Sequence, residues 1–405
     1  MISLRPRGNS GRPFPAALAF AAAAALLSAC APTGGSASGS TAAGTGLAAD
    51  GCTAAPDKPV SLVVGARAGS QRPAVAAGVQ DLLSAAVQNQ QSVQVFRVDG
   101  QPSRALKISP VIKGKNESQR KQEIASAVQQ VAQAVSGLGP KKPEADDLTA
   151  LSEAGKLTGD GGTVVLMDSG LSTTGTISFR DSAMFDADPG ELANFLAAKH
   201  LLPELKNKAV FLAGLGLTAD PQPALDGSLQ KKVVALWQAV AAKAGATCTA
   251  VLPLPDRRQD TVKTDLPVSK VDVPAAPVFR PCGTTVLRDS GPVGFLPNTA
   301  RLRDEKGAHD TLQTLVSQLA GGQKVTLTGN TATFGSPADS VTLSKQRAET
   351  VKALLVKAGI AADRITTVGA GQNGPGRVRD IGPDGTLDPV AAAQNRSVVV
   401  ELSCG

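Results

Sequence analysis

The sequence predicts an α/β protein with two folded domains. The first is a domain with a doubly wound, mostly parallel sheet, and the second is an α+β domain of order β-α-β-α-β-β. Short apolar runs such as 60–64 and 163–167 alternate with segments of helical period, which is typical of a parallel sheet covered on both faces. A polar, proline-rich stretch at 253–282 has little periodicity and separates the two domains as a linker.

The elements of the first domain are expected within 57–252. Each predicted strand is a short, mainly apolar run bounded by turn residues, and each predicted helix carries apolar residues at a period near 3.6. Strands are expected at 60–64, 93–98, 106–112, 163–167, 209–215 and 249–252, and helices at 75–87, 119–135, 191–199 and 229–244.

The elements of the second domain are expected within 283–405. Val351, Leu354 and Leu355 lie at helical spacing and give one of its helices a buried face. Strands are expected at 293–296, 324–331, 365–370 and 397–402, and helices at 305–319 and 342–358.

The N-terminus has the pattern of a secretory signal. Three arginines without any acidic residue precede an apolar stretch at 16–27, which is shorter than the roughly 20 residues of a spanning helix. The stretch ends in Leu27-Ser28-Ala29-Cys30, which resembles a bacterial lipobox. The resemblance implies a signal peptide at 1–29 and a mature N-terminus at Cys30 that carries diacylglycerol and acyl chains such as palmitate. The alternative is an ordinary signal peptide with a chance cysteine.

Residues 30–56 are predicted to be a flexible tether, because 31–50 consists mostly of Gly, Ser, Ala and Thr. Loss of the three arginines in the signal would lower the formal charge of the chain from +7 to +4. That charge is too small to indicate nucleic-acid binding, and no basic stripe with interleaved aromatic residues is present. We therefore expect a membrane partner through the lipid and no nucleic acid.

Four cysteines remain once Cys30 is assigned to the lipid. An even number in an oxidising compartment favours disulfides over a metal site. Four cysteines allow three pairings. Cys52 and Cys248 bracket the first domain, and Cys282 and Cys404 bracket the second. If each cysteine pairs with the other cysteine at the end of its own domain, each domain contains one disulfide.

The sequence offers no recognisable catalytic or cofactor site. His200 and His309 have no serine or cysteine partner in any motif, and no Cys-x-x-Cys is present. The segment 369–374 matches G-x-G-x-x-G, but Pro375 follows where a dinucleotide site would need a helix to begin. We therefore predict no enzyme activity, no cofactor and no metal.

Five motifs of the second domain occur in a characteristic order. They are Val325-Thr326-Leu327-Thr328-Gly329, Phe334-Gly335-Ser336, Leu343-Ser344-Lys345-Gln346-Arg347-Ala348, Gly369-Ala370-Gly371 and Asn395-Arg396. Their order and spacing resemble the C-terminal domain of the outer-membrane protein A family, here called OmpA-like. The resemblance implies the β-α-β-α-β-β fold and association with peptidoglycan.

In the resembled family an aspartate and an arginine hold the two ends of diaminopimelate, an amino acid of the peptidoglycan stem peptide. Arg347 matches the arginine, and Thr331, Asn395 and Arg396 complete the candidate site by resemblance. Ala332 stands fifteen residues before Arg347, where the family has the aspartate. A methyl group cannot bind an ammonium group, so we expect weak binding.

Three interpretations of this altered site stay open. The stem peptide is of another kind, or a nearby acid such as Asp339 substitutes for the aspartate, or the domain has lost peptidoglycan and acts as a scaffold. Ser340 and Ser397 also replace an asparagine and an arginine that are usual in the family. The non-functional interpretation of Arg347 is packing against the edge of the sheet.

Two segments of the first domain, 62–65 and 165–170, resemble the von Willebrand factor A family. Domains of that family often bind a divalent cation through Asp-x-Ser-x-Ser after the first strand. The aligned residues here are 65–69, which contain no carboxylate or hydroxyl and include Arg67, so that Asp168 alone fits. A hard cation needs several oxygen ligands, and we expect none to bind. Asp168 either pairs with Arg67 or caps a turn.

These observations favour a non-catalytic, extracytoplasmic lipoprotein that is anchored to a bacterial membrane at Cys30 and associates weakly with peptidoglycan. The alternative is an envelope scaffold for assembly or protein interaction that no longer binds peptidoglycan. In both cases the first domain is expected to dock a protein partner that the sequence does not identify.

Overall fold

The computed structural model describes residues 47–253, 261–319 and 322–404. The predicted signal peptide, Cys30 and most of the predicted tether lie outside the described residues. Within these ranges no helix combines the length and the apolar character needed to cross a bilayer.

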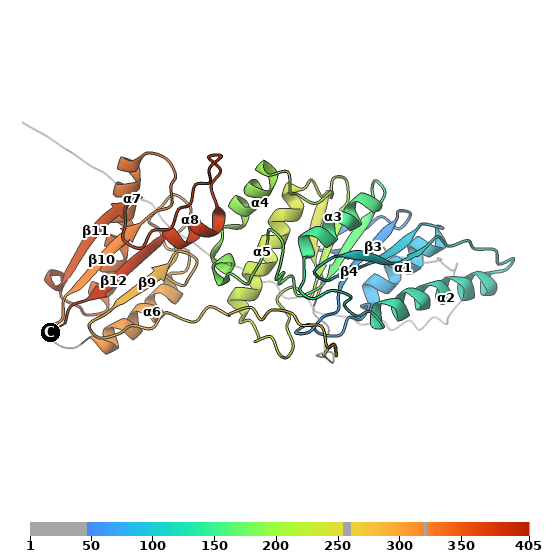
Figure 1. Cartoon of the computed structure of the whole chain (residues 1–405), viewed down its shortest axis with the longest axis horizontal. Helices are drawn as coiled ribbons and strands as arrows, with labels where there is room; N and C mark the ends of the chain where they lie inside the picture. The colour runs from blue at the N-terminus through green and yellow to red at the C-terminus, as the bar shows by residue number, and fades with distance from the viewer. Residues whose placement is uncertain (1–46, 254–260, 320–321, 405) are drawn as a thin grey trace, which may run out of the picture. The chain divides into compact units, whose positions relative to one another are not determined.

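The first domain contains a six-stranded sheet of order β5-β4-β3-β6-β7-β8. Figure 1 labels β3 and β4 of this sheet, with α1, α2 and α3 in the same domain. The pairs β3–β4, β3–β6, β6–β7 and β7–β8 are parallel, and β4–β5 is antiparallel. The predicted mostly parallel sheet is therefore present. In sheet order the strands are β5 (Ser103–Ile108), β4 (Val93–Val98), β3 (Val60–Gly65), β6 (Thr163–Met167), β7 (Ala209–Ala213) and β8 (Cys248–Val251).

Helices cover both faces of this sheet, because its strands are apolar on both sides. Val63 packs into one core cluster with residues of α3, α4 and α5, whereas Leu62 and Val64 pack into another with residues of α1 and α2. The helices are α1 (Ala77–Gln88), α2 (Glu117–Ser136), α3 (Asp147–Leu157), α4 (Pro189–Ala198) and α5 (Gly227–Lys243), with a 3-10 turn at Ser182–Asp186.

Helix α3 was not predicted. Asp146 caps its first turn by accepting from the backbone N–H of Thr149 at 2.9 Å. Two of its buried positions are Ala150 and Ala154, with Leu148 and Leu151 also buried. Small alanines fill the contact with the sheet, so the apolar pattern of the helix is weak in the sequence.

Part of the predicted tether is folded. Strands β1 (Ala48–Ala49) and β2 (Cys52–Thr53) pair as a short hairpin, and Leu47 and Ala54 are buried beside it. The predicted disulfide between Cys52 and Cys248 is present, with the two Cα atoms 5.4 Å apart. It joins the hairpin to the edge strand β8, so a segment of small residues is held on the domain by a covalent bond.

Part of the predicted linker is also docked on the first domain. The Ser269 hydroxyl donates to Glu144 Oε1 at 2.7 Å, and the Val271 N–H donates to Gln222 Oε1 at 2.7 Å. Val271 is 2% exposed and belongs to a core cluster of that domain. An extended, proline-rich segment can be ordered in this way when side chains of the domain satisfy its backbone groups.

The second domain contains a four-stranded sheet of order β11-β10-β12-β9. The pair β10–β11 is parallel, and β12 is antiparallel to both β10 and β9. The strands are β9 (Thr284–Arg288), β10 (Val325–Asn330), β11 (Ile365–Gly371) and β12 (Ser397–Leu402), and the helices are α6 (Glu305–Gln318), α7 (Pro337–Lys357) and α8 (Pro389–Asn395), with a 3-10 turn at Ala362–Arg364.

The predicted order of elements in this domain is present, but the first strand was placed wrongly. It lies at Thr284–Arg288, whereas the predicted segment 293–296 forms an irregular turn in which Phe295 bridges Leu302. Val293 and Phe295 are buried, so the apolar run reflects packing into the core and not strand pairing. Helix α8 was not predicted.

The predicted disulfide between Cys282 and Cys404 is not formed in the structure, where both cysteines are exposed and free. They lie just outside the paired ends of β9 and β12, in which Thr284 is opposite Glu401. A hydrogen bond with Cys282 raises the pKa of Cys404, so the two thiols are close without being joined.

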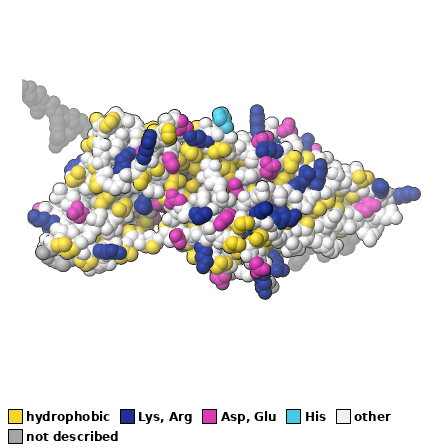
Figure 2. Space-filling model, viewed as in Figure 1, with side chains coloured by type: hydrophobic (Ala, Val, Ile, Leu, Met, Phe, Trp, Pro, Cys, Tyr) yellow, Lys and Arg dark blue, Asp and Glu magenta, His cyan; other side chains and the backbone are white. Residues whose placement is uncertain are grey.

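Charge is mixed over the visible surface of the molecule. In Figure 2, Lys and Arg side chains are interspersed with Asp and Glu side chains on the face shown. The modest positive charge of the chain is thus dispersed on that face.

Candidate functional site

The candidate site of the second domain is built where α7 follows β10. Ser336 caps α7 by accepting from the Asp339 N–H at 3.1 Å, and Pro337 begins the helix. Gly329 lets the helix approach the strand, because a Cβ there would lie 2.0 Å from the Ser344 carbonyl oxygen. This close packing places Arg347 beside the loop that leaves β10.

Arg347 is 5% exposed and has protein contacts on one side of its guanidinium. Its Nε donates to the Thr299 carbonyl at 3.0 Å, and its Cζ lies 5.0 Å from the centre of the Phe295 ring. Within the described residues the two terminal nitrogens make no hydrogen bond, in contrast to Nε. The guanidinium is thus oriented by Thr299 and Phe295 while its terminal nitrogens stay available.

Burial lowers the pKa of Arg347, and the nearby charges of Arg396 and Arg303 lower it further, whereas Asp289 raises it. A guanidinium keeps its proton under all ordinary conditions. The site therefore presents a fixed positive charge.

Ala332 lies in the loop after β10 and is 3% exposed. The acid that sequence reasoning suggested as its substitute, Asp339, accepts from the Ser336 hydroxyl at 2.6 Å in the first turn of α7. Asp339 thus stabilises the helix start, where a negative charge is favoured by the helix dipole.

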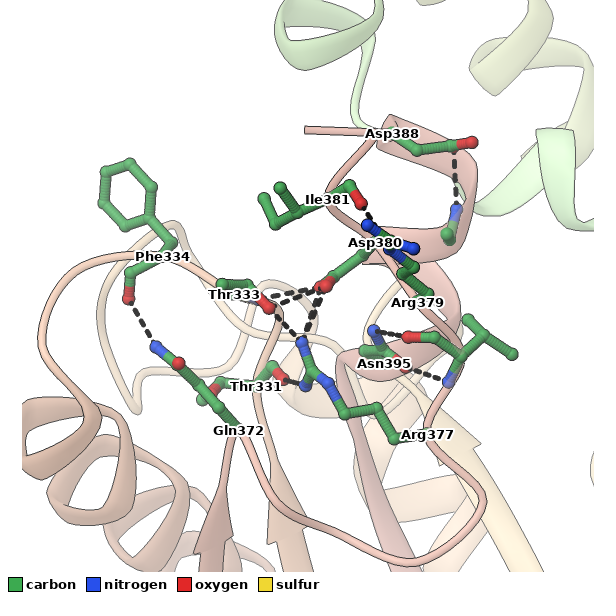
Figure 3. Close-up of polar contacts among 12 residues, drawn as sticks. Thr331, Thr333, Phe334, Gln372, Arg377, Arg379, Asp380, Ile381, Asp388 and Asn395 are labelled. Atoms are coloured by element: carbon green, nitrogen blue, oxygen red, sulfur yellow. Dashed lines mark hydrogen bonds and ion pairs between the residues drawn. The ribbon is translucent and has the colours of Figure 1, made fainter. Parts of the chain in front are cut away.

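Sequence reasoning missed a second acid near this loop, Asp380. Figure 3 shows its carboxylate between Thr333 and Arg377. It accepts from the Thr333 N–H at 2.7 Å and from Arg377 Nη2 at 2.7 Å. Burial would raise the pKa of Asp380, but hydrogen bonds from Thr333 outweigh it and hold the pKa below its usual value. Asp380 therefore holds the loop in place through its hydrogen bonds with Thr333, and the charge of its carboxylate is balanced by Arg377.

Thr331 belongs to the same loop. Its carbonyl accepts from Arg377 Nη1 at 2.8 Å, and its hydroxyl oxygen is buried without a partner among the described residues. Thr331, Ala332 and Arg347 line one large hollow, whose lining also includes first-domain residues such as Asp186 and Glu191. A buried hydroxyl without a protein partner can donate to an added acceptor such as a carboxylate oxygen.

The two residues predicted from the Asn395-Arg396 motif have different places. The Asn395 side chain donates to the Val378 carbonyl at 2.9 Å and accepts from the Val378 N–H at 3.0 Å, which ties the loop to α8 (Figure 3). Asn395 is thus a structural residue. Arg396 follows α8 and lines the hollow, where its Nη2 donates to Glu191 Oε1 at 2.5 Å, so its charge is paired with that carboxylate.

The first domain holds a separate buried cluster where β3 and β6 end. Arg67 Nη1 donates to Asp168 Oδ2 at 2.5 Å, and Arg67 Nη2 donates to the Ser169 hydroxyl at 3.1 Å. Burial raises the pKa of Asp147 well above its usual value, and the negative charge of Asp168 raises it further. Asp168 therefore pairs with Arg67, as one of the two interpretations expected.

Arg67 lies in the segment that the sequence resemblance aligns with the cation-binding motif of the von Willebrand factor A family, a resemblance that stays a prediction. Among the residues that the structure describes, no group of three or more His, Cys, Asp or Glu side chains is positioned to hold a metal ion. The absence of a divalent cation from this domain remains a prediction.

Residues 294–381 match the family model described as the OmpA family. The C-terminal domain is OmpA-like. The match agrees with the resemblance carried by the motifs around Arg347, and it concerns this domain of the chain. The likenesses of the first domain to von Willebrand factor A and of Cys30 to a lipobox stay predictions.

Solved structures similar to the OmpA-like domain come from several bacteria. They include the periplasmic domain of Helicobacter pylori MotB (15% identity, 30% of this chain and 74% of that chain, TM-score 0.24). They also include the peptidoglycan-associated lipoprotein from Burkholderia pseudomallei (19% identity, 29% of this chain and 89% of that chain, TM-score 0.23). A third is the cell wall anchor of the T6SS from Pseudomonas aeruginosa (20% identity, 30% of this chain and 81% of that chain, TM-score 0.24). Likenesses this low carry no argument about function.

A curated relative is 38% identical over 85 residues, which is 21% of this chain. It is the photosystem I P700 chlorophyll a apoprotein A2 of Gloeobacter violaceus, and the chain spans 10% of its length. The shared segment is too short to extend the role of that protein to this one.

Proposed function

We propose that this protein is a non-catalytic component of the cell envelope whose OmpA-like domain associates with peptidoglycan. The observation that carries the proposal is Arg347, whose guanidinium is held from one side by Thr299 and Phe295 and keeps its terminal nitrogens free. The match of residues 294–381 to the OmpA family model supports the same conclusion.

The chemistry of binding follows from the site. A planar guanidinium can take a carboxylate bidentately, and such charge-assisted pairs are about twice as strong as neutral hydrogen bonds. The Thr331 hydroxyl, which lines the same hollow and has no partner among the described residues, is a second donor. Arg377 and Asp380 hold the loop in place through Thr333, so the donors are oriented before the ligand arrives. Binding is expected to be weak because Ala332 adds no polar contact.

The decisive experiment is sedimentation of the purified protein with purified peptidoglycan. Wild type should sediment with the wall, and Arg347→Ala should lower the affinity about tenfold to a hundredfold, the equivalent of about 1.5–3 kcal/mol for hydrogen bonds to a charged group. Arg379→Ala is the matched control, because Arg379 is an exposed arginine of the same domain whose Nε contacts Ile381.

A thermal unfolding curve should show that Arg347→Ala remains folded. Arg347→Lys serves as a second variant that keeps the charge without the planar group, and its affinity should fall between those of wild type and Arg347→Ala. Equal sedimentation of wild type and Arg347→Ala would contradict the proposal.

The membrane anchor belongs to the same proposal and is supported by the sequence motif Leu27-Ser28-Ala29-Cys30. Cys30→Ala should move the protein from the membrane fraction to the soluble fraction. Without the Cys30 thiol the chain has no attachment site for the acyl chains, and stable anchoring requires two or more of them. The measurement is fractionation after a high-salt wash, with Cys282→Ala as the control. A Cys30→Ala variant that stays with the membrane rules out this anchor.

The second candidate is an envelope scaffold for assembly or protein interaction that no longer binds peptidoglycan. The buried methyl group of Ala332, beside a loop whose acid Asp380 is neutralised by Arg377, favours it. In this case neither wild type nor Ala332→Asp sediments with peptidoglycan. The first domain would then supply the surface for a protein partner.

A further inference from the structure

We propose that the first domain carries a binding groove for an extended peptide, and that residues 267–273 of the same chain occupy this groove in the structure. The ligand class is an extended segment of a partner protein with the pattern Ser-x-Val-x-Val, which displaces the chain's own segment. This inference goes beyond the proposed wall association and gives the partner of the first domain a chemistry.

The groove lies where sheets of this kind bind their ligands. The chain builds the sheet from β3 to β4 and β5 on one side and then continues with β6, β7 and β8 on the other, so the strand order reverses between β3 and β6. Open α/β sheets bind ligands outside the carboxyl ends of the strands at such a reversal. Arg67 follows β3 and Ser169 follows β6, and both line a small hollow together with residues 268–271. The segment therefore covers the position at which the fold favours a ligand.

Glu144 contacts the docked segment through three hydrogen bonds. Its N–H donates to the Pro267 carbonyl at 3.3 Å, and its carboxylate accepts from the Ser269 N–H at 3.1 Å and from the Ser269 hydroxyl at 2.7 Å. Glu144 has a φ of 69°, a left-handed conformation that is uncommon for a glutamate and that is found in ligand clamps. A residue with a hydroxyl group is thus bound at this position by a carboxylate acceptor.

Gln222 binds the backbone two residues further along the segment. Its amide oxygen accepts from the Val271 N–H at 2.7 Å, and its amide nitrogen donates to the Val271 carbonyl at 2.9 Å. One side-chain amide thus satisfies both backbone groups of an extended residue, as a neighbouring strand would.

The side chains of the docked segment alternate between the domain and solvent. Val271 is 2% exposed in a core cluster of the first domain, and Val273 packs partly buried against the same cluster. Lys270 and Asp272 are exposed. Residues 267–273 belong to no helix or strand, so their position depends on these contacts. Backbone hydrogen bonds combined with pockets for alternate side chains are the way in which domains recognise extended peptides.

The test adds a fluorescently labelled peptide with the sequence of residues 262–276 to the purified protein and measures binding by anisotropy. Wild type should bind it weakly, because the chain's own segment competes at an effective concentration in the millimolar range. The double variant Ser269→Ala, Val271→Asp should release that segment and raise the affinity for the peptide at least about tenfold. The double variant Lys270→Ala, Asp272→Ala is the matched control, because it changes only outward side chains, and it should bind as weakly as wild type.

Two further changes test whether the groove contacts carry the recognition. Adding Gln222→Ala to the released variant should weaken peptide binding about tenfold, because two backbone hydrogen bonds are lost. A peptide with aspartate in place of the valine that corresponds to Val271 should bind the released variant at least about tenfold more weakly than the unchanged peptide. Equal affinity in either comparison would overturn the inference.

Limited digestion with trypsin tests the same groove in the wild-type protein. The bond after Lys270 lies in the docked segment, so cleavage there should be slow. An excess of the peptide, with its two lysines acetylated so that trypsin spares it, should displace the segment and speed this cleavage at least about threefold. The peptide with aspartate in place of valine should have no effect.

Thermal unfolding shows whether the released variant is folded. A folded variant that binds no peptide would overturn the inference. If the variant does not fold, the digestion of wild type decides, and a rate of cleavage after Lys270 that stays the same in excess peptide would overturn the inference.

Discussion

Arg67→Met is expected to lower the free energy of unfolding of the first domain by about 3–5 kcal/mol, the range found when one partner of a buried ion pair is removed. Arg67 and Asp168 are 2% and 5% exposed, and their 2.5 Å contact lies between two buried side chains. Asp168 is the closer of the two acids on Arg67, since Asp147 Oδ2 lies 4.0 Å from Arg67 Nη2, and burial raises the pKa of Asp147. Loss of Arg67 leaves the Asp168 charge buried without compensation.

The effect should depend on pH in a defined direction. Without Arg67, burial raises the pKa of Asp168 in the folded state above its value in the unfolded chain. Such a group destabilises the fold increasingly as pH rises above the unfolded pKa of about 4. The deficit of Arg67→Met relative to wild type should therefore grow from pH 4 towards pH 8.

The measurement is denaturant unfolding of wild type and variants at several pH values. Arg72→Met is the matched control, because Arg72 is exposed in the same segment, and it should change stability by no more than about 0.5 kcal/mol. Adding Asp168→Asn to Arg67→Met should recover part of the loss and remove its pH dependence. An Arg67→Met protein as stable as wild type would show that the pair is not charged as described.

Removal of the Cys52–Cys248 disulfide is the second large expected effect. The bond closes a loop with a sequence separation of 196, for which the loop-entropy relation gives about 5 kcal/mol. The double variant Cys52→Ala, Cys248→Ala should therefore unfold at a markedly lower denaturant concentration. It also frees the hairpin of β1 and β2 from the sheet edge.

Reductant supplies an independent check. Wild type should lose stability when dithiothreitol is added, whereas the double variant should be insensitive to it. Cys282→Ala is the matched control, since this cysteine is free in the structure, and it should respond to reductant as wild type does. Wild type that is unaffected after complete reduction would contradict the expected contribution.

Local patterns in the sequence predicted those parts of the fold that depend on local signals. The apolar runs at 60–64 and 163–167 indicated strands of a mostly parallel sheet, and the structure pairs them as β3 and β6. An apolar run can reflect either strand pairing or packing into the core, and for the first strand of the second domain the prediction chose wrongly between the two. The run at 293–296 is apolar because Phe295 packs in the core, and the true strand β9 is half exposed and therefore inconspicuous.

The motif around Arg347 by itself determined that the C-terminal domain is OmpA-like, a prediction that the family match over 294–381 confirms. The surroundings of that arginine were decided by the tertiary structure. Thr299 and Phe295 reach it from an irregular turn, and Asp380 clamps the loop from a segment with no motif. Arg67 and Asp168, 101 residues apart, meet because β3 and β6 are neighbours in the sheet. Periodicity records which side of an element is buried, whereas the partner of a charge depends on distances in space between segments that are remote in the chain.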